Sequence, residues 1–217
     1  MQHLVLRPDG TSFTAERAEP NEELDFFASE DRWCRPVMAR AGPDGALWVV
    51  DMYRYMIEHP QWLPAGGKAE MKPFERFGME YGRIYRVYKD GKPPRRIPRL
   101  DKSSVKELVT HLASGNGIIR DMAHRLLVQR NDVSATETLV KMAGTHASAK
   151  ARLHALCVLD GLDRLSPTLL KSAFRDPHPG IRRHALRLAE SRWDGEPELL
   201  KASVLLAEDP HAAVRLQ

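Results

Sequence analysis

The stretch DPHPGIRRHA at residues 176–185 decides the fold of the second half of this chain, because its pattern recurs. An apolar residue, an arginine and, three positions after the arginine, an alanine occur at residues 119–123, 151–155 and 181–185, and the pattern begins again at residue 214. The arginines of these repeats are 32, 30 and 33 residues apart. A period of this length with helix-length halves is typical of an α-solenoid of stacked helical hairpins.

Signals for helix starts support this phasing. Ser104 and Ser134 are each followed three residues later by a glutamate, which fits a capping box, and Ser166 precedes a proline at the first helical position. No proline occurs between Pro98 and Pro167, as helices require. The sequence therefore predicts a solenoid over residues 101–217.

Upstream of the repeats, the composition changes twice. Residues 89–99, KDGKPPRRIPR, combine prolines that forbid a helix with charges that stay hydrated, so we predict an extended linker over residues 89–100. Thirteen of the 15 aromatic residues lie at or before Tyr88, which gives residues 1–88 the composition of strands and turns.

Two turn motifs organise these first residues. PDG at residues 8–10 and GPDG at residues 42–45 each separate two short apolar runs, as hairpin turns do. Residues 47–50 are apolar on both faces, which predicts an inner strand, and residues 82–88 alternate with period two, which predicts another strand of the same sheet.

Residues 42–54, GPDGALWVVDMYR, followed by EHP at 58–60 and GRIYRV at 82–87, resemble the last β-propeller blade of a bacterial family of membrane-bound dehydrogenases. Members of this family are similar to soluble sugar-dehydrogenase propellers joined to HEAT-like repeats, often with a c-type cytochrome domain. The resemblance implies a parent protein in the periplasm or cell envelope that oxidises sugars or alcohols. It also implies a quinone cofactor, calcium and c-type haem for that parent, and none of these cofactors for this chain.

A closed propeller needs at least four blades of roughly 40–50 residues, and residues 1–88 are too few for one. We therefore expect an α+β multidomain chain, with a partial β-propeller of one or two final blades followed by the HEAT-like α-solenoid. On this interpretation the chain is a fragment, with its last repeat truncated. Its partners would be the remaining blades and a cytochrome domain of the parent.

The HEAT resemblance also implies a ladder of paired charges. Asp-Pro pairs precede Arg182 and Arg215 by six residues, and in that family such aspartates and arginines form a ladder along the inner helices. The first two repeats depart from the pattern, with Asn116 and Ser148 near the turn. The predicted structural ladder consists of Arg120, Arg152, Asp176, Arg182, Asp209 and Arg215.

A cluster of polar residues among aromatics, around the end of the apolar strand, is the candidate site. As a substrate pocket, it would use His59 as proton acceptor, with Asp51 or Glu58 orienting it and the arginines holding an anionic or quinone-like group. The candidate catalytic residues are thus His59, Asp51 and Arg54. The candidate substrate-binding residues are Arg32, Trp33, Tyr53 and Glu58. The alternative interpretation is structural, because polar side chains that end a strand often bond the backbone of the following turn.

Several classes of protein and site are excluded. The net charge of +4 is spread over both halves, and acidic residues alternate with the repeat arginines, so we expect no nucleic-acid binding. Cys34 and Cys157 are too far apart for a zinc, redox or haem-attachment motif. Histidines such as His154 and His184 lack metal-ligand spacing, so we predict no metal site and treat them as solvent-facing or inter-repeat hydrogen-bonding groups. No apolar run is long enough to insert into a membrane.

Two functions remain as expectations. In the first, the chain is part of a propeller-type dehydrogenase and serves as its structural and interaction module, without catalysis of its own. In the second, the chain is a HEAT-repeat scaffold that binds a protein or a carbohydrate and has no redox role.

Overall fold

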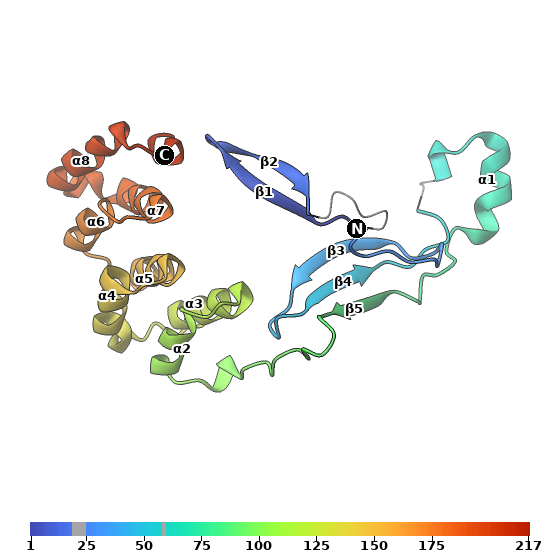
Figure 1. The fold of residues 1–217 in the computed structure, drawn as a ribbon, viewed down its shortest axis with the longest axis horizontal. Helices are drawn as coiled ribbons and strands as arrows, with labels where there is room; N and C mark the ends of the chain where they lie inside the picture. The colour runs from blue at the N-terminus through green and yellow to red at the C-terminus, as the bar shows by residue number, and fades with distance from the viewer. Residues whose placement is uncertain (19–24, 58–59) are drawn as a thin grey trace. The chain divides into compact units, whose positions relative to one another are not determined.

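The computed structural model describes residues 1–18, 25–57 and 60–217 (Figure 1). The chain divides into two compact units. The sheet unit comprises Met1–Leu6 and Ala15–Ile97, and the helical unit comprises Arg7–Thr14 and Pro98–Gln217.

The strands form two separate antiparallel sheets. β1 (Leu4–Asp9) pairs with β2 (Ser12–Arg17), and a second sheet has the order β3 (Pro36–Ala41), β4 (Leu47–Asp51) and β5 (Arg83–Val87). β4 is the central strand of the larger sheet, with Trp48 opposite Arg40 on one side and Arg86 on the other. Val49 in this strand is fully buried, in keeping with its continuous apolar sequence.

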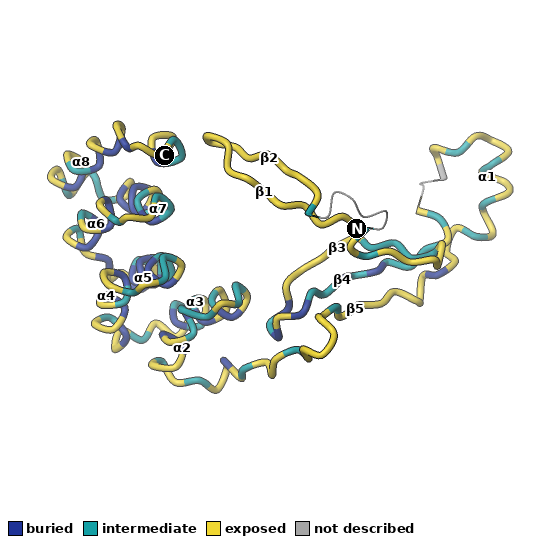
Figure 2. The backbone as a smooth tube through the Cα atoms, in the orientation of Figure 1, coloured by how far each residue is buried: buried dark blue, intermediate teal, exposed yellow. Residues whose placement is uncertain are grey.

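The predicted partial propeller is wrong. The described residues hold one two-stranded and one three-stranded sheet, and no propeller is found. β1 and β2 are exposed along their whole length, including the apolar Leu4, Leu6 and Phe13, so neither face of their hairpin is covered (Figure 2). Between β4 and β5 the chain forms helical turns, namely η1 (Pro60–Trp62), α1 (Ala65–Met71) and η2 (Lys72–Phe74), where a blade would continue with strands.

The helical unit is built from pairs of helices. α2 (Val105–His111) pairs with α3 (Gly117–Arg130), α4 (Thr136–Thr145) with α5 (Ala149–Gly161), and α6 (Pro167–Ala173) with α7 (Pro179–Ala189). α8 (Pro197–Val204) and α9 (Ala212–Arg215) follow. The short segments η3 (Leu100–Lys102), η4 (Val133–Ala135), η5 (Glu190–Gly195) and η6 (Leu205–Glu208) connect them.

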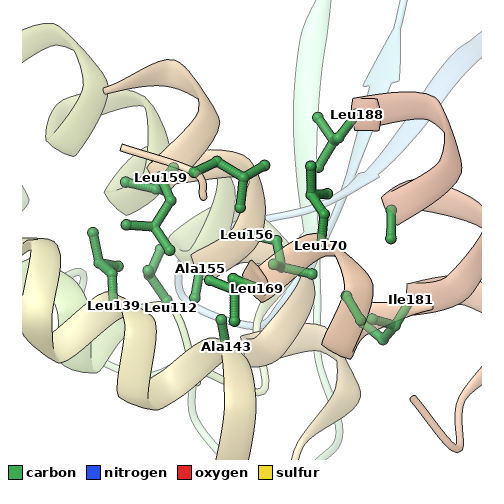
Figure 3. Packing of buried hydrophobic residues seen from close by; sticks show 14 of the residues in the cluster. Leu112, Leu139, Ala143, Ala155, Leu156, Leu159, Leu169, Leu170, Ile181 and Leu188 are labelled. Atoms are coloured by element: carbon green, nitrogen blue, oxygen red, sulfur yellow. The ribbon is translucent and has the colours of Figure 1, made fainter. Parts of the chain in front are cut away.

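Two rows of helices run through this unit. α3, α5, α7 and α9 contact one another in succession, and α4, α6 and α8 do the same on the other side. Leucines and alanines fill the space between the rows, as Leu156, Leu170 and Ala155 illustrate in Figure 3. Leu156 and Leu170 are fully buried, so the core is continuous from one pair to the next.

The turns inside the pairs show how the sequence starts each second helix. Asp176 accepts a hydrogen bond from the backbone N–H of His178 (2.8 Å), and the ring Nδ1 of His178 then caps α7 by accepting from Gly180 N–H (3.1 Å). Asn116 and Ser148 are likewise N-caps. They therefore occupy the position of His178, and the residues that replace the Asp-Pro aspartate are Ser114 and His146.

Candidate functional site

Asp51 ends β4 and is only 1% exposed. Its carboxylate accepts hydrogen bonds from the backbone N–H groups of Arg35 (2.7 Å) and Tyr53 (2.8 Å) and from the hydroxyl of Tyr85 (3.3 Å). Burial alone would raise the pKa of Asp51, but the two backbone hydrogen bonds hold it below its usual value. The predicted catalytic carboxylate therefore connects the backbone just before β3, at Arg35, to the backbone just after β4, at Tyr53.

Tyr53, two residues after Asp51, has the left-handed conformation, with φ of 51°. Its ring lies under the guanidinium of Arg83, whose central carbon is 4.0 Å from the ring centroid. Gly78, with φ of 87°, packs against the backbone of Tyr53 so closely that a Cβ there would lie 2.5 Å from the Tyr53 carbonyl oxygen. Only glycine fits this contact, which holds two loops of the sheet unit together.

Trp33 joins these loops into one aromatic cluster. Its ring centroid lies 5.8 Å from that of Tyr53, 5.5 Å from that of Tyr55 and 6.4 Å from that of Phe77. Phe77 also accepts a hydrogen bond through its backbone oxygen from Tyr55 N–H (3.2 Å). The structure thus brings together Trp33 and Tyr53, two of the predicted substrate-binding residues.

The remaining predicted site residues are placed differently. Arg54 donates its backbone N–H to the carbonyl of Trp33 (3.0 Å), and its side-chain Nη1 is buried without a hydrogen-bond partner among the described residues. Arg32 is exposed, and its carbonyl accepts a hydrogen bond from the Arg35 side chain. Glu58 and His59 lie outside the described residues.

An open hollow of about 840 Å³ lies beside this aromatic cluster. Its walls are Trp33, Phe77, Met79 and Tyr81, together with the charged Arg76 and Glu80 and with Gly78. Tyr81 is 64% exposed and Phe77 47% exposed, so aromatic surface faces solvent at this place. The sequence interpretation missed residues 76–81, because no strand or motif marks them. The clustering of Phe77 and Tyr81 around a glycine was the available signal.

A second buried carboxylate, Asp44, belongs to the GPDG turn. It accepts hydrogen bonds from Ala46 N–H (3.1 Å) and from the indole N–H of Trp48 (3.2 Å), and it pairs with the guanidinium of Arg86. Burial would raise the pKa of Asp44, but the hydrogen bond from Ala46 N–H and the pairing with Arg86 keep it below its usual value. The aspartate of the motif therefore has a structural role in joining the β3–β4 turn to β5.

In the helical unit, two of the predicted ladder arginines bind aspartates of the following repeat. Arg152 meets Asp176 through two hydrogen bonds of 2.7 and 2.8 Å, and Arg182 meets Asp209 with the same two distances. The Nη1 of Arg182 donates to the carbonyl of Asp176, six residues before it (2.9 Å). An aspartate therefore gives its backbone oxygen to its own repeat and its carboxylate to the arginine of the previous one.

The first and last ladder arginines keep only the contact within their own repeat. Arg120 donates to the carbonyl of Ser114 (2.7 Å), and its Nε is buried without a partner among the described residues. Arg215 donates to the carbonyl of Asp209 (2.7 Å). Across the described ranges, no carboxylate forms an ion pair with Arg120 or Arg215.

Histidines also connect repeats. The Nδ1 atoms of His124 on α3 and His154 on α5 are 3.2 Å apart, and Asp121 lies 3.7 Å from the Nε2 of His154. Burial lowers the pKa of both histidines, and for His154 the neighbouring His124 lowers it further. Among the described residues, no group of three or more histidine, cysteine, aspartate or glutamate side chains could hold a metal ion.

Comparison with known proteins gives one result. Residues 1–91 match the model of a family described as a domain of unknown function (DUF7133). No curated protein matches the chain. Within the part of the chain that the structure describes, no helix is long and apolar enough to cross a membrane. The resemblance to membrane-bound dehydrogenases therefore stays a prediction.

Proposed function

We propose that this chain is a non-catalytic binding module, and that its sheet unit takes a carbohydrate in the hollow lined by Trp33, Phe77 and Tyr81. The observation that carries the proposal is the composition of this hollow. Solvent-exposed aromatic rings stand there beside a guanidinium and a carboxylate, Arg76 and Glu80.

These residue types match the two kinds of surface on a sugar ring. The C–H faces of a pyranose are apolar and stack on aromatic rings, while its hydroxyl groups need donors and acceptors of hydrogen bonds. A guanidinium supplies donors and a carboxylate supplies acceptors, and bonds to charged groups are stronger than neutral ones. A hollow with both surfaces suits such a ligand better than a purely apolar one.

The contacts of Asp51 argue against a catalytic role for this side chain. Its carboxylate is 1% exposed, lies outside the hollow, and joins the backbone of Arg35 and Tyr53 to the hydroxyl of Tyr85, so it has a structural role. The dehydrogenase role that the resemblance implies would belong to a longer protein. In that case, carbohydrate binding here would hold a sugar substrate near the reaction.

The test is calorimetric titration of the purified chain with a panel of soluble oligosaccharides. Replacing Tyr81 by alanine should weaken binding by about tenfold or more, because the ring supplies exposed stacking surface. Tyr88→Ala is the matched control, since Tyr88 is also exposed but lies outside the hollow. The proposal fails if no member of the panel binds, or if both variants lose the same affinity.

A further inference from the structure

The last helix pair exposes apolar side chains whose counterparts one pair earlier are buried. α6 follows its N-cap Ser166 and α8 follows Glu196, so Leu170 corresponds to Leu200 and Phe174 to Val204. Leu170 and Phe174 are 0% and 5% exposed, whereas Leu200 and Val204 are 40% and 62% exposed. The difference arises because α8 packs on α6, and α8 is the last helix of its row in the described chain.

These side chains border a hollow of about 260 Å³ between α7, α8 and α9. Leu200 and Val204 line it together with Trp193, Val214, the guanidinium-bearing Arg215 and Glu190, whose carboxylate accepts a hydrogen bond from the side chain of Gln217 (3.0 Å). We call this surface the α8–α9 face. Its apolar part resembles the side of the α6 segment on which α8 packs, where Leu170 and Phe174 are buried.

Arg215 shows what chemistry belongs at the polar edge of the α8–α9 face. In Arg152 and Arg182, the Nη1 atom donates a hydrogen bond to a carbonyl in the turn before its own helix. The Nε atom donates to the aspartate carboxylate of the next helix pair. Arg215 makes the first contact, to the carbonyl of Asp209. Its remaining N–H groups are therefore oriented by the fold for a carboxylate at the edge of an apolar surface.

We propose that the α8–α9 face binds a further helical hairpin, whose turn presents an aspartate to Arg215 while its first helix covers Leu200 and Val204. Charge complementarity and apolar complementarity select the same occupant. A second copy of this chain fits poorly, because its first helix pair has Ser114 at the ladder position and offers no carboxylate there.

The experiment supplies such a hairpin to the full chain. Arg215 corresponds to Arg182 and Gln217 to His184, so a copy of residues 185–217 appended after Gln217 continues α9 and adds a second copy of the α8–α9 hairpin. The extended chain should gain helical circular dichroism and a higher urea midpoint. In the extended chain, Arg215→Gln should lower the stability and so raise the unfolding equilibrium constant by about tenfold.

A double-mutant cycle identifies the contact. Changing the copied aspartate to asparagine should cost about as much as Arg215→Gln, and combining both changes should add little, because either one breaks the same pair. Arg215→Gln in the unextended chain, and Arg183→Gln in the extended chain, are controls and should have smaller effects. Arg183 is exposed and is not a ladder residue.

Three results would overturn the proposal. The first is no gain of helix in the extended chain. The second is strictly additive effects in the cycle, which would show that Arg215 and the added aspartate do not meet. The third is a concentration-dependent dimer of the unextended chain that Arg215→Gln abolishes in sedimentation experiments, which would make a second copy the occupant.

Discussion

Single arginines connect the helix pairs of this chain. Arg182 donates hydrogen bonds to the carboxylate of Asp209 and to the carbonyl of Asp176. Asp209 is only 6% exposed. The Arg182 hydrogen bonds hold the pKa of Asp209 below its usual value. Replacing Arg182 by alanine leaves a buried carboxylate without its main partner, so we expect a loss of about 1–3 kcal/mol in the free energy of unfolding.

Urea unfolding of the two proteins measures this loss. Arg183→Ala is the matched control, because the neighbouring side chain is exposed and outside the ladder. An Arg182→Ala protein with an unchanged midpoint would show that the side chain is a solvated surface charge.

Histidines connect two of the helices directly. The contact between Nδ1 of His124 and Nδ1 of His154 requires one ring to donate and the other to accept, so protonation of both rings breaks it. The pKa values of both side chains lie below the ordinary 6.5 in the folded protein. The unfolded chain therefore takes up protons first as the pH falls, and stability conferred by the neutral pair is lost from about pH 6.5 downward.

We expect the free energy of unfolding to fall by about 1 kcal/mol between pH 7 and pH 5, a figure kept small because solvent screens these half-buried rings. His124→Gln should flatten this dependence, and His111→Gln, at the end of α2, is the matched control. Parallel pH profiles for the wild type and His124→Gln would contradict the explanation. Protonation of the ladder aspartates does not contribute between pH 7 and pH 5. The pKa values of Asp176 and Asp209 are lowered, so these side chains take up protons only at lower pH.

Local sequence signals predicted single elements better than their assembly. Ser104 forms the predicted capping box with Glu107, and Ser166 caps α6 as its proline indicated. The partners of the ladder could not be assigned in this way. The six-residue spacing suggested that Asp176 belongs to Arg182, whereas the carboxylate binds Arg152 of the previous repeat, a contact set by the stacking of helix pairs.

The assembly of the strands was mispredicted for a related reason. A blade and an isolated three-stranded sheet share the same alternation and the same GPDG turn, and the difference lies in what the intervening chain does. Residues 65–71 form α1 there. Because α1 has no buried side chain, its sequence has no amphipathic pattern from which a helix could be predicted. Asp51 illustrates the same limit at the candidate site, because its position at a strand end suited both a catalytic and a structural role until its three donors were located.

For the whole molecule, these contacts lead to a prediction about activity. We expect the purified chain to show no dehydrogenase turnover when a quinone cofactor, calcium and an artificial electron acceptor are supplied. Asp51 is only 1% exposed, and its carboxylate accepts hydrogen bonds from the backbone of Arg35 and Tyr53 and from the Tyr85 hydroxyl, so these groups would have to move before it could contact a substrate. Dye reduction with sugars and alcohols measures the turnover, with Arg32→Ala and His59→Ala proteins assayed in parallel. Robust oxidation that His59→Ala abolishes would overturn the prediction, and it would assign catalysis to the segment around His59 instead of to the carboxylate of β4.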